Sequence, residues 1–209
     1  MIKVLIADDH SVVRKGLKQI IEEEFRSATI QEAIDGNELL KKVRSEKFDI
    51  VISDISMPGR NGLESLKQLK EEYPKLPILI LSMHPEEQYA VRTLKAGASG
   101  YLTKESASEE LVKAVKQILG GRRYISASVA EKLAENLDIK NENELHENLS
   151  NREFDVLKLI ASGKTVSDIA KVFSLSVNTI STYRARILEK MKFKNNAELT
   201  HYAILKKLV

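Results

Sequence analysis

The sequence contains no cysteine among its 209 residues. Disulfide bonds, thiolate catalysis and cysteine-ligated zinc sites are therefore excluded. No apolar stretch reaches about 18 residues, the length that a membrane-spanning helix requires. The first apolar run, Val4–Ala7, ends at Asp8 and is too short for the core of a signal peptide. We therefore expect a cytoplasmic protein that makes no contact with a membrane.

Charge is unevenly distributed, although the net charge is only +3. Residues 149–209 hold 11 Lys or Arg against 5 Asp or Glu, and residues 137–148 hold 1 against 4. Residues 1–136 are balanced, with 21 of each sign. The N-terminal region is thus neutral, the stretch 137–148 acidic and the C-terminal region basic. This pattern predicts that the two ends of the chain bind different partners.

The first 121 residues alternate between short apolar runs and amphipathic stretches. Strands are expected at 2–8, 29–33, 49–54, 78–82 and 100–103. Helices are expected at 11–24, 36–46, 62–73, 86–97 and 108–120. This alternation predicts an α/β domain, a doubly wound five-stranded parallel sheet of the flavodoxin-like kind with helices on both faces.

The alternation stops after Gly121. A short helical pattern at 126–137 leads into a polar, acidic stretch, so we expect a helix and a linker over residues 122–148. The remaining residues, 149–209, predict an all-α domain of four helices. These helices are expected at 151–162, 166–173, 177–191 and 196–207.

Polar side chains stand at the ends of four predicted strands: Asp8 and Asp9, Asp54, Ser82, and Lys104. The carboxyl ends of parallel strands meet at one edge of a sheet, where ligands bind. Turns favour Asp on their own account, which explains any one of these residues but not the whole set. Three acids, one hydroxyl and one lysine at that edge predict a site for a divalent cation and a phosphoryl group.

Asp54 is the candidate nucleophile of this site, because a carboxylate can accept a phosphoryl group as a mixed anhydride. Lys104 would pair with the phosphoryl oxygens, and Ser82 would donate a hydrogen bond to another of them. His10 follows the acids directly, and a metal-ligand role competes with the plainer interpretation that it begins the first helix.

The first 121 residues resemble the receiver domain of two-component response regulators. The motifs that carry the resemblance are IADDH (Ile6–His10), ISDISMPGRNG (Ile52–Gly62), LSMH (Leu81–His84) and AGASGYLTK (Ala96–Lys104). The resemblance implies that a sensor histidine kinase phosphorylates Asp54. It also implies Mg²⁺ bound by Asp9, Asp54 and the carbonyl of Ser56, with Asp8 acting through water.

Further roles follow from the same resemblance. It implies that the Ser82 hydroxyl moves toward the phosphate and that the Tyr101 ring then turns inward. Tyr101 has a second interpretation, as an edge-strand tyrosine with a packed ring and a solvated hydroxyl. Two residues depart from common choices of the family, namely Ser56 in place of Asn and Glu105 in place of Pro.

The second and third predicted tail helices are joined by only three residues, Ser174–Ser176, which is helix-turn-helix spacing. Short polar side chains and arginines would lie outward on the third helix, suited to the major groove of DNA. The alternative is a solvated amphipathic helix whose charges serve solubility. The predicted DNA-binding residues are Lys164, Asn178, Thr179, Ser181, Thr182, Arg184, Ala185 and Arg186.

The segment Leu149–Ala203 resembles the LuxR-type DNA-binding domain, and its union with a receiver resembles the NarL/FixJ class of response regulators. Val166 and Ser167 stand where the family usually has a polar and a basic residue. Family positions that often contact bases hold the small residues Ser181, Thr182 and Ala185 here, so base contacts would depend more on Arg184 or on water.

The sequence therefore predicts a bacterial transcription regulator and not an enzyme. Expected partners are a sensor histidine kinase, double-stranded DNA, RNA polymerase and, after phosphorylation, a second copy of the chain. One rival is a Mg²⁺-dependent phosphatase or phosphotransferase for small molecules. Such enzymes place an acidic residue two positions after the nucleophile, where this chain has Ser56. Another rival is a DNA-binding protein with a vestigial receiver.

Overall fold

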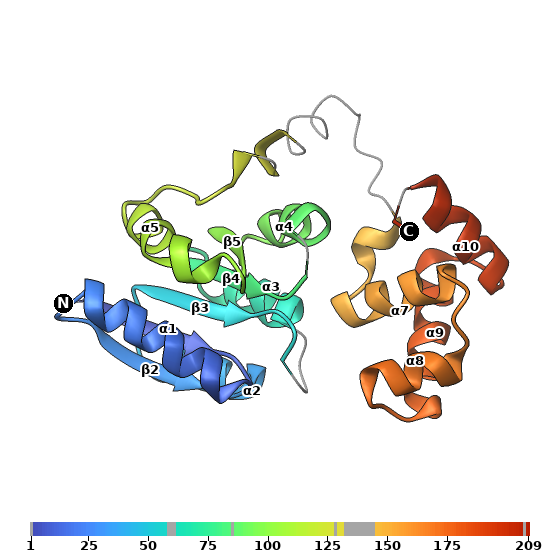
Figure 1. Ribbon diagram of the computed structural model, residues 1–209, viewed down its shortest axis with the longest axis horizontal. Coiled ribbons are helices and arrows are strands. Elements are labelled where there is room, and N and C mark those ends of the chain that lie inside the picture. Colours follow the sequence, from blue (N-terminus) through green and yellow to red (C-terminus); the bar gives the residue numbers. More distant parts are fainter. Residues whose placement is uncertain (1, 58–61, 85, 128, 132–144, 207) are drawn as a thin grey trace. The chain divides into compact units, whose positions relative to one another are not determined.

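The computed structural model describes residues 2–57, 62–84, 86–127, 129–131, 145–206 and 208–209 (Figure 1). Contacts divide the chain into two units, residues 1–140 and residues 141–209. The domain boundaries expected from the sequence, at residues 121 and 148, remain predictions. Within the described residues, no helix combines the length and the apolar character needed to cross a membrane.

The first unit contains the predicted sheet. Its strands follow the spatial order β2-β1-β3-β4-β5, and every neighbouring pair is parallel. Each strand lies within one residue of its expected range, because β-branched runs bounded by polar residues define both ends. The strands are β1 (Lys3–Ala7), β2 (Thr29–Ala33), β3 (Ile50–Asp54), β4 (Ile78–Ser82) and β5 (Gly100–Thr103).

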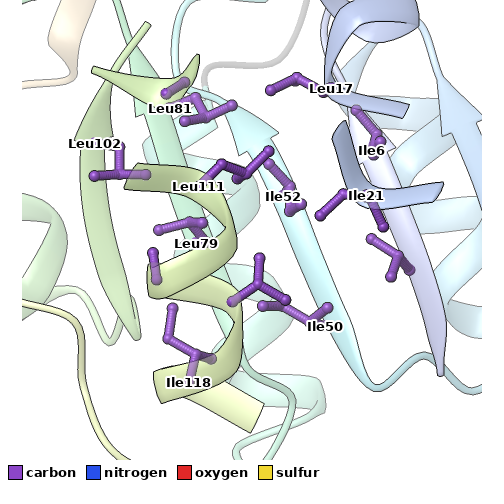
Figure 2. Close-up of a cluster of buried hydrophobic side chains, with 14 of the residues drawn as sticks. Ile6, Leu17, Ile21, Ile50, Ile52, Leu79, Leu81, Leu102, Leu111 and Ile118 are labelled. Atoms are coloured by element: carbon purple, nitrogen blue, oxygen red, sulfur yellow. The ribbon is translucent and has the colours of Figure 1, made fainter. Parts of the chain in front are cut away.

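In the part of residues 11–119 that the structure describes, five helices connect and follow these strands, which confirms the predicted doubly wound α/β domain. Helices α1 and α5 pack against each other and against one face of the sheet. Figure 2 shows the apolar cluster between them, including Ile6, Ile52, Leu79 and Leu111. The helices are α1 (Ser11–Glu24), α2 (Gly36–Ser45), α3 (Gly62–Glu72), α4 (Glu86–Lys95) and α5 (Ala107–Leu119).

Helix α3 begins at Gly62, close to the end of β3. A Cβ atom at this position would lie 2.5 Å from Ile55 Cα and 2.8 Å from the Asp54 carbonyl oxygen. Only glycine fits without moving this backbone, so Gly62 fixes the loop that follows Asp54. The predicted turn at Pro58–Gly59 lies outside the described residues.

The chain returns to the sheet after α5, where the sequence predicts that the α/β alternation has ended. Tyr124 N–H donates to the Ser99 carbonyl at 2.8 Å, and Tyr124 forms a parallel bridge with Gly100. A Cβ atom at Gly100 would lie 3.0 Å from Tyr124 Cβ. Tyr124 is therefore packed directly on β5, with 5% of its surface exposed.

The second unit contains the four predicted helices, preceded by a short 3₁₀ turn. Their amino termini are capped by side chains of Ser150, Thr165, Ser176 and Asn195, each stabilising its helix by about 1 kcal/mol. The elements are η1 (Leu145–Asn148), α7 (Asn151–Ala161), α8 (Val166–Phe173), α9 (Val177–Met191) and α10 (Asn196–Leu205).

Helices α8 and α9 form the predicted helix-turn-helix. Ser174, with φ 53°, ends α8 in the left-handed conformation, and Ser176 accepts a hydrogen bond from Thr179 N–H at 3.1 Å. The fold of the second unit thus confirms the helical domain expected from the sequence.

The end of the predicted linker differs from expectation. Residues 145–148 form η1, in which His146 is 8% exposed and its Nδ1 lies 2.9 Å from the Tyr202 hydroxyl. The His146 ring also stacks on Phe154, with 5.6 Å between the ring centroids. His146 therefore packs within the second unit, where aromatic contacts replace the solvation that the polar composition of this stretch suggests. Of the helix expected at 126–137, residues 127 and 129–131 are helical and 128 and 132–137 lie outside the described residues.

Candidate functional site

Carboxylates and an ammonium group meet at the carboxyl-terminal edge of the sheet. Asp8 follows β1, Asp54 ends β3, and Lys104 follows β5. Ala7 pairs with Ser53 in the parallel ladder, so the next residues, Asp8 and Asp54, emerge side by side. The structure brings together the charged groups that the sequence places at separate strand ends.

Lys104 bridges the two buried acids. Its Nζ lies 2.7 Å from Asp8 Oδ2 and 2.7 Å from Asp54 Oδ2. The carboxylates are 1% and 2% exposed, and the lysine side chain is 8% exposed. Charges withdrawn from water require a partner, so Lys104 offsets part of the negative charge here. Asp54 Oδ1 also accepts a hydrogen bond from Ser56 N–H at 3.0 Å.

The electrostatics leave this site short of positive charge. Burial raises the pKa of the Asp54 carboxyl and the Asp8 charge adds to the rise, although the Lys104 ammonium and Ser56 N–H oppose it. Burial lowers the pKa of Lys104, but its contacts with Asp54 and Asp8 outweigh burial and hold that pKa above its usual value. Lys104 therefore stays protonated, while the anionic form of Asp54 is only partly compensated and favours a further cation.

A set of possible metal ligands surrounds Asp54. One ligand atom from each of Asp8, Asp9, His10 and Asp54 lies within 4.8 Å of the others. Asp8 Oδ2 is buried and pairs with Lys104 Nζ, which also holds Asp54 Oδ2. Three carboxylates gathered around a single lysine suit a divalent cation.

His10 is the N-cap residue directly before α1, close to the helix start that one of its two interpretations expects, but its side chain does not cap the helix. Its Nδ1 lies 2.9 Å from Asp9 Oδ1 and 3.1 Å from Asp8 Oδ1. The ring therefore faces the acids instead of the free amides of the first helical turn.

Ser82 and Tyr101 are linked through the loop after β4. Ser82 is fully buried at the end of β4, and its Oγ accepts a hydrogen bond from His84 N–H at 3.0 Å. The Tyr101 hydroxyl donates to the His84 carbonyl at 2.9 Å, with the residue 1% exposed. The solvated hydroxyl considered for Tyr101 is therefore not observed.

His84 is a residue of this site to which the sequence gave no role. Its Nε2 lies 3.3 Å from Ser56 Oγ, and its ring stacks on Tyr89 at 4.3 Å between centroids. It thus joins the loop after β3 to the loop after β4. Its position two residues after Ser82 could have indicated a role in the site only if the loops after β3 and β4 were already known to be neighbours.

The predicted DNA-binding residues lie on or near α9, and most are exposed. Asn178, Ser181, Thr182, Ala185 and Arg186 are exposed on α9, while Thr179 and Arg184 are half-buried. Lys164 is exposed before α8. The outward face of α9 therefore offers hydroxyl, amide, methyl and guanidinium groups, the groups that read base edges and bind phosphates.

One side of α9 is hollowed, with a volume of about 340 Å³ lined by Asn178, Thr179, Thr182, Tyr183 and Arg186. Tyr183 was not predicted as a DNA-binding residue, because helical periodicity alone places it near the inward face. Its half-exposed ring borders the same hollow as the predicted contacts. Tyr183 lies four residues after Thr179, which places both on the same side of the helix, and this spacing could have identified it from the sequence.

Arg184 differs from Arg186 in its surroundings. Arg184 Nε donates to Asn196 Oδ1 at 2.6 Å and so ties α9 to the first residue of α10. Arg186 is exposed and borders the hollow on α9. Arg184 therefore has a structural contact within the unit, which restricts the base contacts considered for it from the sequence.

Comparisons with known proteins cover both units. Residues 4–116 match the family model of the response regulator receiver domain, and residues 147–203 match that of the bacterial regulatory proteins of the luxR family. Response regulator UvrY of Escherichia coli strain K12 is 34% identical over 205 residues, which cover 98% of this chain and 94% of UvrY.

Solved structures of RcsB are similar to the whole chain. RcsB from Salmonella enterica serovar Typhimurium, bound to promoter P1flhDC in the presence of phosphomimetic BeF3⁻, is 28% identical with a TM-score of 0.59. The match covers 96% of this chain and 97% of that chain. A structure of two RcsB dimers bound to two parallel DNAs matches with the same identity, TM-score and coverage.

Proposed function

The chain belongs to the response regulators of the NarL/FixJ family, which join a receiver domain to a LuxR-type DNA-binding domain, and we propose that Asp54 is its phosphoacceptor. Its relatives are transcription regulators, and it is a DNA-binding regulator and not an enzyme. The observation that carries the proposal is the buried contact of Asp54 with Lys104 at the carboxyl-terminal edge of the sheet.

A sensor histidine kinase is the proposed phosphoryl donor. An Asp54 carboxylate oxygen attacks the phosphorus atom of a phosphohistidine, the P–N bond breaks, and its electron pair stays on the imidazole nitrogen. The product is an acyl phosphate on Asp54. Lys104 lies 2.7 Å from the same carboxylate and is placed to pair with an added phosphoryl oxygen.

Mg²⁺ is the proposed cofactor, because the carboxylates of Asp8, Asp9 and Asp54 lie together and Lys104 offsets only part of their charge. Asp9, Asp54 and the Ser56 carbonyl would hold it, with Asp8 contributing through water. When bound, it supplies positive charge that neutralises the phosphoryl oxygens during transfer.

Ser82 and Tyr101 are proposed to report the modification. Leu81 pairs with Asp54 in the parallel ladder between β4 and β3. Ser82, the next residue, therefore lies at the end of β4 beside the end of β3 that holds Asp54. Ser82 Oγ and the Tyr101 hydroxyl both contact His84, at its N–H and its carbonyl. A movement of the serine hydroxyl toward a phosphate would release His84 N–H and shift the loop that Tyr101 contacts.

Double-stranded DNA is the proposed partner of α9, through Lys164, Asn178, Thr179, Ser181, Thr182, Arg184, Ala185 and Arg186. The exposed face of α9 and its basic surroundings support major-groove binding. RcsB dimers bound to DNA support a homodimer of this chain on paired half-sites. RNA polymerase is proposed as the partner through which bound protein changes transcription, and the cytoplasm as the location.

The experiment that tests the proposal compares Asp54→Ala with Asp49→Asn, a change of the aspartate just before β3. Labelled acetyl phosphate should be incorporated by the wild type and by Asp49→Asn, but not by Asp54→Ala. Phosphate-enhanced DNA binding should be lost only in Asp54→Ala. Incorporation that survives Asp54→Ala would assign the phosphoryl group to another residue.

A further inference from the structure

Val177 is an exposed apolar residue at the start of the helix proposed to bind DNA. It is the first residue of α9, directly after the capping residue Ser176, and 48% of its surface is exposed. The buried residues of α9 are instead Ile180, Ile187 and Met191, so the packing of the second unit depends little on an apolar side chain at position 177. The valine side chain is therefore available to a partner of α9.

Val177 shares one face of α9 with two of the predicted DNA-binding residues. Ser181 and Ala185 follow at spacings of four residues, which places all three on the same side of the helix, and all three are exposed. Because Ser181 and Ala185 are small, this side of α9 can approach base edges closely. Val177 is the largest apolar residue of the three, and it lies at the amino-terminal end, the part of a recognition helix that contacts base edges.

Several polar groups of α9 already have hydrogen-bond partners within the protein. Thr182 Oγ1 donates to the Asn178 carbonyl at 3.0 Å, and Thr179 Oγ1 lies 2.8 Å from Ser176 Oγ. Arg184 is likewise bonded to α10. Hydrogen bonds from these side chains to bases would compete with the contacts inside the protein. Apolar contacts with bases therefore gain weight in sequence recognition by α9.

The amino terminus of α9 also lacks negative charge that would repel DNA. The first turns of α7, α8 and α10 hold Glu153, Asp168 and Glu198, whereas the first turn of α9, a helix that the structure describes in full, holds no acidic residue. The partial positive charge of a helix amino terminus favours the phosphate backbone. Contacts with phosphates fix the register of a protein on the duplex, and here they would hold Val177 against the bases.

We propose that Val177 sets part of the DNA sequence preference by contacting the C5-methyl group of one thymine in the major groove of each half-site. This inference rests on the DNA binding of the proposed function. Thymine presents a methyl group in the major groove, and an apolar side chain recognises it by removing both surfaces from water. Cytosine at the same position would be disfavoured, because its amino group would lose water without gaining a hydrogen-bond partner from valine.

The test starts from duplexes that the wild-type full chain selects out of randomised DNA. Each thymine of a selected half-site is replaced in turn by uracil, which lacks only the C5-methyl group. Fluorescence anisotropy then gives the ratio of the dissociation constants for the uracil and the thymine duplex. One thymine should give a ratio of about four in the wild type, the value expected for one buried methyl group.

Three variants assign the methyl contact. Val177→Ala should reduce the ratio to about one at that thymine alone, because the truncated side chain does not reach the methyl group. Val177→Ile, which keeps a branched apolar side chain, should retain the ratio. Val172→Ala is the matched control, since Val172 is a valine of similar exposure, 57%, on α8, and this variant should keep the wild-type ratio.

The outcomes separate this inference from the proposed function. A ratio of about four that persists in Val177→Ala would assign the methyl contact to another residue and overturn the inference, while DNA binding itself would stand. Ratios of about one at every thymine in the wild type would overturn it too, because no methyl group would then be recognised. Loss of the ratio in both Val172→Ala and Val177→Ala would also overturn it, since the effect would come from the shape of the second unit. A wild-type chain that selects no duplex would contradict both the inference and the proposed DNA binding.

Discussion

Lys104 Nζ and Asp54 Oδ2 lie 2.7 Å apart, and the two residues belong to the ends of β5 and β3. These strands are not neighbours, since β4 lies between them. The lysine side chain therefore spans the width of one strand to reach the acid. The pair connects the proposed phosphoacceptor to the strand that also holds Tyr101.

Lys104→Met should destabilise the receiver at neutral pH, because it leaves Asp8 and Asp54 buried without their cation. The expected loss is about 3 kcal/mol in the free energy of unfolding. Without the ammonium, burial raises the pKa of Asp54 further, so its anionic form destabilises the fold above that pKa. The loss should therefore shrink as the pH falls and the carboxylate takes up a proton.

The measurement is differential scanning calorimetry of the full chain over a series of pH values. Lys116→Met is the matched control, because Lys116 pairs with Glu24 at the surface with 56% of its side chain exposed. Such a pair contributes at most about 1 kcal/mol. Equal effects of the two changes would show that the Lys104 contact carries no special weight.

Gly62→Ala should disturb the loop after Asp54. The added Cβ atom would meet backbone at 2.5 Å from Ile55 Cα, and backbone cannot yield as a flexible side chain does. We expect a loss of about 2 kcal/mol in stability and slower phosphorylation by acetyl phosphate. Unchanged stability and phosphorylation would show that the loop after Asp54 tolerates a side chain here.

Gly16→Ala is the matched control for this substitution. A Cβ atom at Gly16 meets nothing within 4 Å, and the residue is exposed in α1. Because alanine favours the helix, this change should raise stability by about 0.5–1 kcal/mol and leave phosphorylation unchanged. Calorimetry and labelled phosphate incorporation on the same preparations distinguish the two sites.

The sequence predicted the sheet edge well because strand ends leave a local signal. Asp54 and Lys104 each follow an apolar run, and in a parallel sheet such ends converge whatever the details of packing. The helix-turn-helix was equally predictable, since Ser176 is a favourable cap three residues after α8 ends. Both the strand ends and the helix cap are determined by residues that are close to one another in the sequence.

Contacts between distant segments left no such signal. The hydrogen bond from Arg184 to Asn196 joins two helices, and arginine on a predicted recognition helix suggests DNA instead. His146 lies in a stretch whose polar composition predicts a linker, yet its ring packs on Phe154. The orientation of His10 toward the acids also depends on a side-chain rotamer that the sequence does not specify.

Tyr124→Phe should change the response of stability to alkaline pH. Burial and the nearby Glu110 carboxylate raise the pKa of the Tyr124 hydroxyl from 10.0 to about 12. At a pH between these two pKa values, the Tyr124 hydroxyl ionises in the unfolded chain but stays neutral in the folded chain. The contribution of Tyr124 to the free energy of unfolding is therefore fully present below pH 10 and declines as the pH rises toward 12. At pH about 11 the decline should reach about 1 kcal/mol in the wild type.

Urea unfolding of the wild type and Tyr124→Phe at neutral and at alkaline pH checks this. The variant lacks the ionising hydroxyl, so the difference between the two proteins should depend on pH. Glu110→Gln should weaken the dependence without abolishing it, because burial is the larger cause. The same alkaline loss in wild type and Tyr124→Phe would exclude Tyr124 as its source.

Arg184→Ala and Arg186→Ala should both weaken DNA binding, but only the first should destabilise the protein. Arg184 loses its hydrogen bond to Asn196, which costs about 1 kcal/mol, whereas Arg186 is exposed. If Arg186 binds a phosphate, its removal should lower affinity for all duplexes and reduce the salt slope by about 1.

Fluorescence anisotropy with a labelled duplex over a range of salt concentrations measures both quantities, and calorimetry measures stability. Arg122→Ala removes the same charge from the first unit and is the control for net charge. Arg122→Ala should leave the salt slope unchanged, because Arg122 lies outside the helix-turn-helix. A salt slope that Arg186→Ala also leaves unchanged would show that the exposed face of α9 binds no phosphate at this position, and DNA binding would then have to depend on Lys164 and the remaining residues of α9.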